Sequence, residues 1–197
     1  MLRPRVLPLL ALPLALLLLL PTPTQAQDLH PSRRLSPIGI TRADVGEAYV
    51  KVTYGRPYMR NRTVYGELVP YGQVWRTGAN EDTEITVTED VMVAGERLAA
   101  GTYTLYTVPG EAEWEVRFSP QVGLWARGIF DPNADPRFTA NVYDESQDAL
   151  RISVPSGSLD EPVDPFTINL QPMDDGSHHL VMSWADTEVR VPFTPAG

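Results

Sequence analysis

Apolar and polar residues alternate along much of this 197-residue chain, and a period of two is the pattern of half-buried β-strands. Residues 48–54 (AYVKVTY) show it clearly, because small or apolar side chains share one face with a tyrosine while Lys51 and its polar neighbours take the other. The same pattern recurs in a set of further short segments. These are 83–89 (TEITVTE), 114–118 (WEVRF), 149–155 (ALRISVP), 166–172 (FTINLQP), 179–185 (HLVMSWA) and 188–193 (EVRVPF).

Turn sequences separate these segments. Residues 91–108 contain Ala94-Gly95 and Ala100-Gly101, which divide the stretch into paired short strands. Asp175-Gly176 supplies a hairpin turn further along. About nine short strands, with no long stretch of helical period, predict an all-β fold, an antiparallel β-sandwich, rather than an α/β fold.

The N-terminus has the three-part layout of a secretory signal peptide. Arg3 and Arg5 precede a leucine-rich apolar stretch at 7–20, and Thr24-Gln25-Ala26 ends in a small residue suited to cleavage before Gln27. A transmembrane anchor is the alternative, but the apolar stretch is short and two prolines interrupt it. We therefore predict a periplasmic or secreted protein, and the absence of cysteine excludes both a lipoprotein anchor and disulfides.

The pattern predicts three parts in the chain. We expect a signal peptide at 1–26, a flexible leader at 27–43 and a single β-sandwich domain at 44–195. The best helix candidate is one or two turns at 122–127, and the proline-rich stretch 155–165 is expected to be a surface loop.

The charge of the chain excludes two classes of partner. Without its signal peptide the protein has 14 basic and 25 acidic residues, a net charge of −11. Nucleic-acid phosphates and anionic lipid surfaces both require a basic face, so we expect no nucleic-acid partner and no membrane insertion after signal cleavage. The acidic surplus favours solubility and mutual repulsion.

Four sequence motifs follow each other at short spacing: YGRP at 54–57, GELVPYG at 66–72, VWRTGANE at 74–81 and AGTY at 100–103. Together they resemble a family of exported bacterial proteins known only as a domain of unknown function, with the signature YGRP…GxLVPYGxVWRTGANE…AGTY. The resemblance covers residues 36–193 and implies a β-sandwich without an established activity.

Two features depart from that family pattern. Asn61 stands before Arg62 where the family usually has glycine, so the turn there is expected to differ. Residues 126–140 look like an insertion.

The motif block contains both turn chemistry and directional side chains. Glycine and proline at 70–72 and 77–79 indicate turns, and Val74 and Trp75 can anchor the loop in the core. Arginine offers a planar set of donors, asparagine offers donor and acceptor, and aromatic rings offer flat faces. The candidate ligand-binding residues are Arg56, Tyr71, Trp75, Arg76, Asn80 and Glu81.

Three interpretations of these residues remain open. In the first, the loop binds a small polar or carbohydrate ligand in a pocket lined by Tyr71, Trp75, Arg76 and Asn80. In the second, the block is structural scaffolding, with Arg56 or Arg76 paired to Glu81 in a buried ion pair. In the third, the protein is a hydrolase-type enzyme with Glu81 as general base and Arg76 stabilising negative charge.

Other chemistry is poorly supported by the sequence. There is no cysteine, and His178 and His179 are adjacent residues that point to opposite faces of a strand, so we expect no zinc site and no cofactor. Residues 131–135 place oxygen ligands at alternate positions but lack the glycine and glutamate of a calcium loop. Lys51, the sole lysine, could in principle form an internal amide with Asn80 if the two strands concerned paired.

Overall fold

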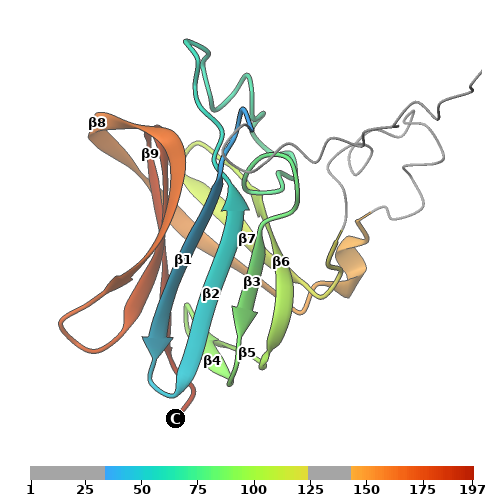
Figure 1. The fold of residues 1–197 in the computed structure, drawn as a ribbon, viewed down its shortest axis with the longest axis vertical. Coiled ribbons are helices and arrows are strands. Elements are labelled where there is room, and N and C mark those ends of the chain that lie inside the picture. The colour runs from blue at the N-terminus through green and yellow to red at the C-terminus, as the bar shows by residue number, and fades with distance from the viewer. Residues whose placement is uncertain (1–33, 124–142) are drawn as a thin grey trace, which may run out of the picture.

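The computed structural model describes residues 34–123 and 143–197, which form nine antiparallel strands in one sheet (Figure 1). The strands are β1 (Ile38–Val45), β2 (Ala48–Gly55), β3 (Glu84–Val87), β4 (Val91–Val93), β5 (Glu96–Leu98), β6 (Gly101–Val108), β7 (Glu113–Ser119), β8 (Leu150–Pro172) and β9 (His178–Pro195). Their order in the sheet is β1-β2-β3-β6-β7-β8-β9-β4-β5, and a short 3-10 helix η2 (Glu145–Gln147) precedes β8. The prediction of an all-β antiparallel fold is confirmed.

The two longest strands curl the sheet over its own core. The first part of β8 pairs with β7, and its later part pairs with β9 (Figure 1). The later part of β8 lies against β1 and β2, at the opposite end of the sheet. There the Tyr54 hydroxyl accepts from the Ile168 N–H at 2.8 Å and donates to the Ile168 carbonyl at 3.2 Å. The Leu170 N–H donates to Thr41 Oγ1 at 3.2 Å. The two layers that enclose the core are therefore parts of one continuous sheet.

The alternating pattern predicted for β2 is confirmed in detail. Val50 and Val52 are fully buried in the core, whereas Lys51 is exposed and pairs across the ladders with Arg42 and Thr86. Lys51 therefore lies on the outer face of the sheet. The hypothetical amide with Asn80 is wrong, because Lys51 is exposed on the outer face of β2, whereas the Asn80 side chain donates to the Ser36 carbonyl.

The first strand begins earlier than the sequence suggested. We expected a flexible leader through residue 43, but β1 starts at Ile38 and pairs with β2 along its whole length. β1 is hard to recognise in the sequence because its exposed face carries isoleucine at 38 and 40, while the inward positions include glycine, threonine and alanine. Its first residues therefore invert the apolar-inward alternation that marks β2.

The expected surface loop at 155–165 is also wrong, since these residues belong to β8. Prolines normally interrupt a ladder, and here two of them fall between Ser158 and Thr167, where the register with β9 shifts twice. The segments at 149–155 and 166–172 are thus one bent strand. In the same way, the segments at 179–185 and 188–193 both belong to β9.

Several predictions fall wholly or in part outside the described residues. These are the signal peptide at 1–26, the helix candidate at 122–127 beyond Gly123, the calcium-like stretch at 131–135 and the insertion at 126–140. Among the residues that the structure does describe, no helix has the length and apolarity needed to cross a membrane.

Candidate functional site

Trp75 fixes the motif loop to the core. Its backbone N–H donates to the Thr107 carbonyl at 2.7 Å, and the Thr107 N–H returns a bond to the Trp75 carbonyl at 2.9 Å. The indole N–H donates to the Gly78 carbonyl at 3.1 Å, and the ring stacks on Trp184 with centroids 5.9 Å apart. Other aromatic rings meet Trp75 edge-on, namely Tyr65, Trp114 and Phe166. The core-anchor function predicted for Trp75 therefore holds.

Glycines from two motifs allow the loop to touch the end of β2. A Cβ atom at Gly55 would lie 1.8 Å from the Ala79 carbonyl oxygen, and one at Gly78 would lie 3.0 Å from the Gly55 carbonyl oxygen. Only backbones without side chains can approach so closely. The YGRP and WRTGANE motifs are therefore two sides of one backbone contact, and this contact sets where the residues after Trp75 lie.

A cavity of about 410 Å³ opens between this loop, the loop after β2, and residues 35 and 36. Its polar and aromatic lining consists of Arg60, Arg62, Arg76, Asn80, Tyr58, Trp75 and Trp184. Leucine, valine and proline side chains complete the wall, and none of the described lining residues carries a carboxylate. We call it the arginine cavity.

Arg76 is the least satisfied of the three arginines. Its side chain is half-buried, and its Nε is enclosed without a hydrogen-bond partner in the described part of the chain. Burial lowers the pKa of the Arg76 guanidinium, while the negative charge of Asp82 acts in the opposite direction. A donor left unpaired at such a position costs free energy and calls for an explanation.

Trp184 presents a second donor of the same kind. The residue is only 1% exposed, and its indole Nε1 has no hydrogen-bond partner among the described residues. Trp75, which lines the same cavity, has its indole N–H satisfied by Gly78. The contrast identifies Trp184 and Arg76 as the two cavity residues with an unused buried donor.

The other two arginines are held by backbone carbonyls. Arg60 Nη2 donates to the Leu35 carbonyl at 3.0 Å. Arg62 donates from Nε to the Met59 carbonyl and from Nη2 to the Tyr58 carbonyl, both at 2.9 Å. These bonds orient the two guanidinium groups at the cavity wall but leave their charges without a carboxylate partner in the described part of the chain.

Backbone strain is concentrated around the cavity. Of the six non-glycine residues with positive φ in the described chain, four lie in its two loops: Arg60 (50°), Asn61 (58°), Thr77 (56°) and Asn80 (66°). Positive φ is unusual for a β-branched residue, and Thr77 is held there by a bond from Thr83 Oγ1 to its carbonyl at 2.7 Å. Asparagine is one of the few residues besides glycine that adopts this left-handed conformation readily, which suits Asn61 to its position. Such strain accumulates at ligand-binding loops.

The other candidate residues from the sequence are Arg56, Asn80 and Tyr71, and each has a different set of contacts. Arg56 donates to the Phe166 carbonyl at 3.3 Å and to Thr167 Oγ1 at 3.1 Å, so it joins the end of β2 to β8. Asn80 lines the arginine cavity and donates from Nδ2 to the Ser36 carbonyl at 3.2 Å. Tyr71 is 42% exposed and lies outside the cavity lining.

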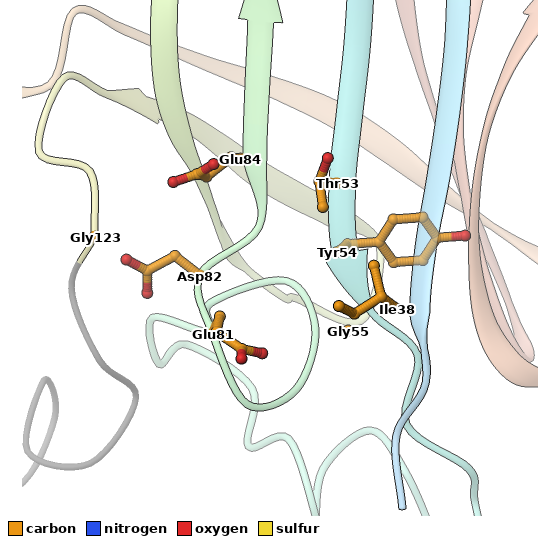
Figure 2. Close-up of a pocket in the computed structure, with 8 residues that line it drawn as sticks. All are labelled: Ile38, Thr53, Tyr54, Gly55, Glu81, Asp82, Glu84 and Gly123. Carbon is orange, nitrogen blue, oxygen red and sulfur yellow. The ribbon is translucent and has the colours of Figure 1, made fainter. Parts of the chain in front are cut away.

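Glu81 lies at a different cavity, of about 300 Å³, which Figure 2 shows. Asp82 and Glu84 join it there, and both of these carboxylates extend toward Gly123 (Figure 2). Glu81 itself forms an ion pair with Arg34. Within the described residues no group of three or more histidine, aspartate or glutamate side chains is arranged to hold a metal ion.

These positions bear on each of the earlier interpretations. The expected ion pair of Arg56 or Arg76 with Glu81 is wrong, because Glu81 pairs with Arg34 and Arg56 bonds to β8. The hydrolase-type interpretation needed Glu81 and Arg76 together, but they line different cavities. Of the four residues expected to line a pocket, Trp75, Arg76 and Asn80 line the arginine cavity and Tyr71 does not.

Four polar or aromatic residues of the cavity lining are not among the candidates from the sequence: Tyr58, Arg60, Arg62 and Trp184. Two arginines beside Tyr58 directly after a strand are a readable signal for an anion site. Trp184 ends a run of five consecutive buried residues in β9, and nothing in its sequence context distinguishes a core tryptophan from one that also lines a cavity.

Comparison with known proteins identifies a family but no activity. Residues 36–193 match the family described as "Protein of unknown function (DUF2911)". No curated protein and no solved structure matches the chain.

Proposed function

Since the chain belongs to the family of proteins of unknown function DUF2911, its activity must be inferred from the site, and we propose that it is an exported protein that binds a small anionic ligand in the arginine cavity. One observation carries the proposal. Arg76 presents a charged, half-buried side chain to the cavity with its Nε unpaired. A folded protein tolerates such a group where a ligand satisfies it.

The electrostatics of the cavity support an anion. Three guanidinium groups share one cavity in a protein whose formal net charge is −9, and no carboxylate of the described residues lines it. Like charges that line one cavity repel each other, and a bound anion offsets that repulsion. Arginine is also the side chain best suited to recognising a carboxylate or a phosphate through paired donors.

The hydrogen bonds of the motif residues favour ligand binding over a purely structural role for Arg76. Arg56 and Glu81 both have partners that tie segments of the chain together, as a scaffold requires. Arg76 donates no hydrogen bond within the described residues, although the strained loop that carries it is fixed at both sides by Trp75 and by the Gly55–Ala79 contact. The scaffold therefore positions Arg76 without a hydrogen bond from its guanidinium, while the charge of Asp82 acts on it.

Export is part of the proposal and rests on the N-terminal sequence. It places the binding cavity in the periplasm or outside the cell, where the ligand would be an extracytoplasmic metabolite. Expression with the native N-terminus, fractionation and intact-mass measurement test it. Export predicts a chain that begins near Gln27, and a full-length chain retained in the cytoplasm would contradict it.

Thermal unfolding in the presence of a ligand panel tests the binding function. The panel contains small carboxylates, inorganic phosphate, neutral sugars and amino acids. A true ligand at about one hundred times its Kd adds about 2.7 kcal/mol of stability, which raises the Tm of a domain this size by several degrees. We expect anions to raise the Tm and neutral sugars to leave it unchanged.

Matched arginine variants complete the test. Arg76→Gln and the double variant Arg60→Gln/Arg62→Gln should lose the response to anions. Arg42→Gln removes an exposed arginine of β1 that is not part of the cavity lining, and it should respond like the wild type. Equal anion responses in all the variants would refute the assignment of the ligand to this cavity.

A further inference from the structure

We propose that the ligand is a monocarboxylate with a flat apolar body, and that the Trp184 indole N–H joins Arg76 in binding the carboxylate. This inference rests on the proposed function and specifies its ligand class. Trp184 was not a candidate from the sequence, and its contribution follows from the burial of its side chain and the state of its donor.

The two unused donors define what the ligand must offer. Arg76 Nε and Trp184 Nε1 are both buried, both lack a partner in the described chain, and both belong to side chains that line the arginine cavity. One donor is charged and the other neutral. A carboxylate has two oxygens and can accept from both at once, which satisfies two buried groups with one bound anion.

The charge count favours a monoanion. Arg60 and Arg62 already donate to backbone carbonyls, so their guanidinium groups are partly satisfied where they stand. Arg76 is the arginine that has no such bond. A single negative charge matches a single unsatisfied guanidinium, whereas a dianion would have to give up a larger hydration shell for the same donors.

The apolar part of the wall calls for an apolar ligand body. Tyr58, Leu35 and Leu68 line the cavity and are 38%, 72% and 39% exposed, whereas the rings of Trp75 and Trp184 are already almost completely buried. Inorganic phosphate or a sugar would leave Tyr58 and the two leucines uncovered, while a planar ring can pack against them. The volume of about 410 Å³ lies within the roughly 300–1,000 Å³ of small-molecule sites.

Calorimetric titration of the mature protein with four probes tests the ligand class. The probes are benzoate, the neutral isostere benzamide, phenyl phosphate and inorganic phosphate. We expect benzoate to bind at least about tenfold more tightly than benzamide, the size of one hydrogen bond to a charged group. We also expect benzoate to bind more tightly than either phosphate.

Trp184→Phe tests the indole donor, with Trp114→Phe as its matched control. Both remove a tryptophan from the same aromatic cluster, but Trp114 does not line the cavity. The readout is the ratio of the benzoate and benzamide affinities, because a general loss of packing weakens both ligands alike. Trp184→Phe should reduce this ratio about fivefold or more, and Trp114→Phe should leave it unchanged.

The possible outcomes separate a failure of this inference from a failure of the proposed anion-binding function. Tighter binding of phenyl phosphate or inorganic phosphate than of benzoate overturns the carboxylate class and leaves an anion site in place. An unchanged ratio in Trp184→Phe overturns the donor assignment. If Trp184→Phe does not fold, Arg76→Gln reports the same ratio, and a wild-type ratio there overturns the inference. Binding of none of the anions overturns both this inference and the proposed function.

Discussion

Two arginines of the motif block should respond oppositely to the same substitution. Arg76→Met should leave the free energy of unfolding unchanged or raise it by about 1 kcal/mol, whereas Arg56→Met should lower it by about 2 kcal/mol. Methionine keeps an unbranched apolar side chain in both positions and removes the guanidinium. The difference between the variants therefore reports what each charge contributes to the folded protein.

The magnitudes follow from the contacts. Arg56 loses two hydrogen bonds, to the Phe166 carbonyl and to Thr167 Oγ1, at a half-buried position. Bonds to a charged group contribute about 1.5–3 kcal/mol in total at such a site after allowance for solvent. Arg76 loses no hydrogen bond and relieves an unpaired buried donor, a cost of about 1–3 kcal/mol. The lost attraction to Asp82 offsets part of that gain.

Urea unfolding at neutral pH, followed by tryptophan fluorescence, measures the difference. The slope of the free energy with urea must stay constant, so that a change in midpoint is a change in stability. In thermal unfolding the same 2 kcal/mol would lower the Tm of Arg56→Met by about 4–8 °C. If Arg76→Met proves as unstable as Arg56→Met, then Arg76 is scaffolding and is not reserved for a ligand.

Two further substitutions test the fold around the site. Gly55→Ala places a Cβ atom 1.8 Å from the Ala79 carbonyl oxygen, so we expect a loss of about 1–3 kcal/mol in urea unfolding together with weaker anion binding. Gly157→Ala, whose nearest contact would be 3.7 Å, is the control, and equal stability of the two variants would contradict the close contact. Burial raises the pKa of Tyr65, with a smaller contribution from Asp186, so the folded protein holds this phenol neutral and should lose stability as pH rises above about 10. Tyr65→Phe should lose less stability than the wild type between about pH 8 and about pH 11, and parallel losses in both proteins would contradict this source of alkaline sensitivity.

The fold was largely predictable because its strands obey a simple alternation. β2 and β3 carry β-branched side chains inward and polar ones outward, and the ladder between them confirms it. The predictions are wrong for the two strands that do not show this alternation clearly, β1 and β8. β1 has glycine and threonine inward and isoleucine outward, and β8 passes through prolines at its register shifts without leaving the sheet.

The site was predictable only in part, because a sequence shows which donors are present but not which of them are already used. Arg56 and Arg76 look equivalent in the motif block, yet Arg56 bonds to a strand more than a hundred residues away. Glu81 stands five residues after Arg76 but lines another cavity, since the loop separates the two side chains. Trp184 reaches the cavity because β9 curls over the core, and no local sequence pattern predicts that curl.

A titration by nitrogen–proton NMR tests the central claim most directly, because it observes the two unused donors themselves. Benzoate should shift the Arg76 Nε–H and Trp184 Nε1–H resonances downfield together, with one common Kd, as each donor gains an acceptor. The Trp114 indole resonance, from outside the cavity lining, should stay in place and serve as the internal reference. Saturation of the protein with benzoate while the Arg76 and Trp184 resonances remain unmoved would contradict the account.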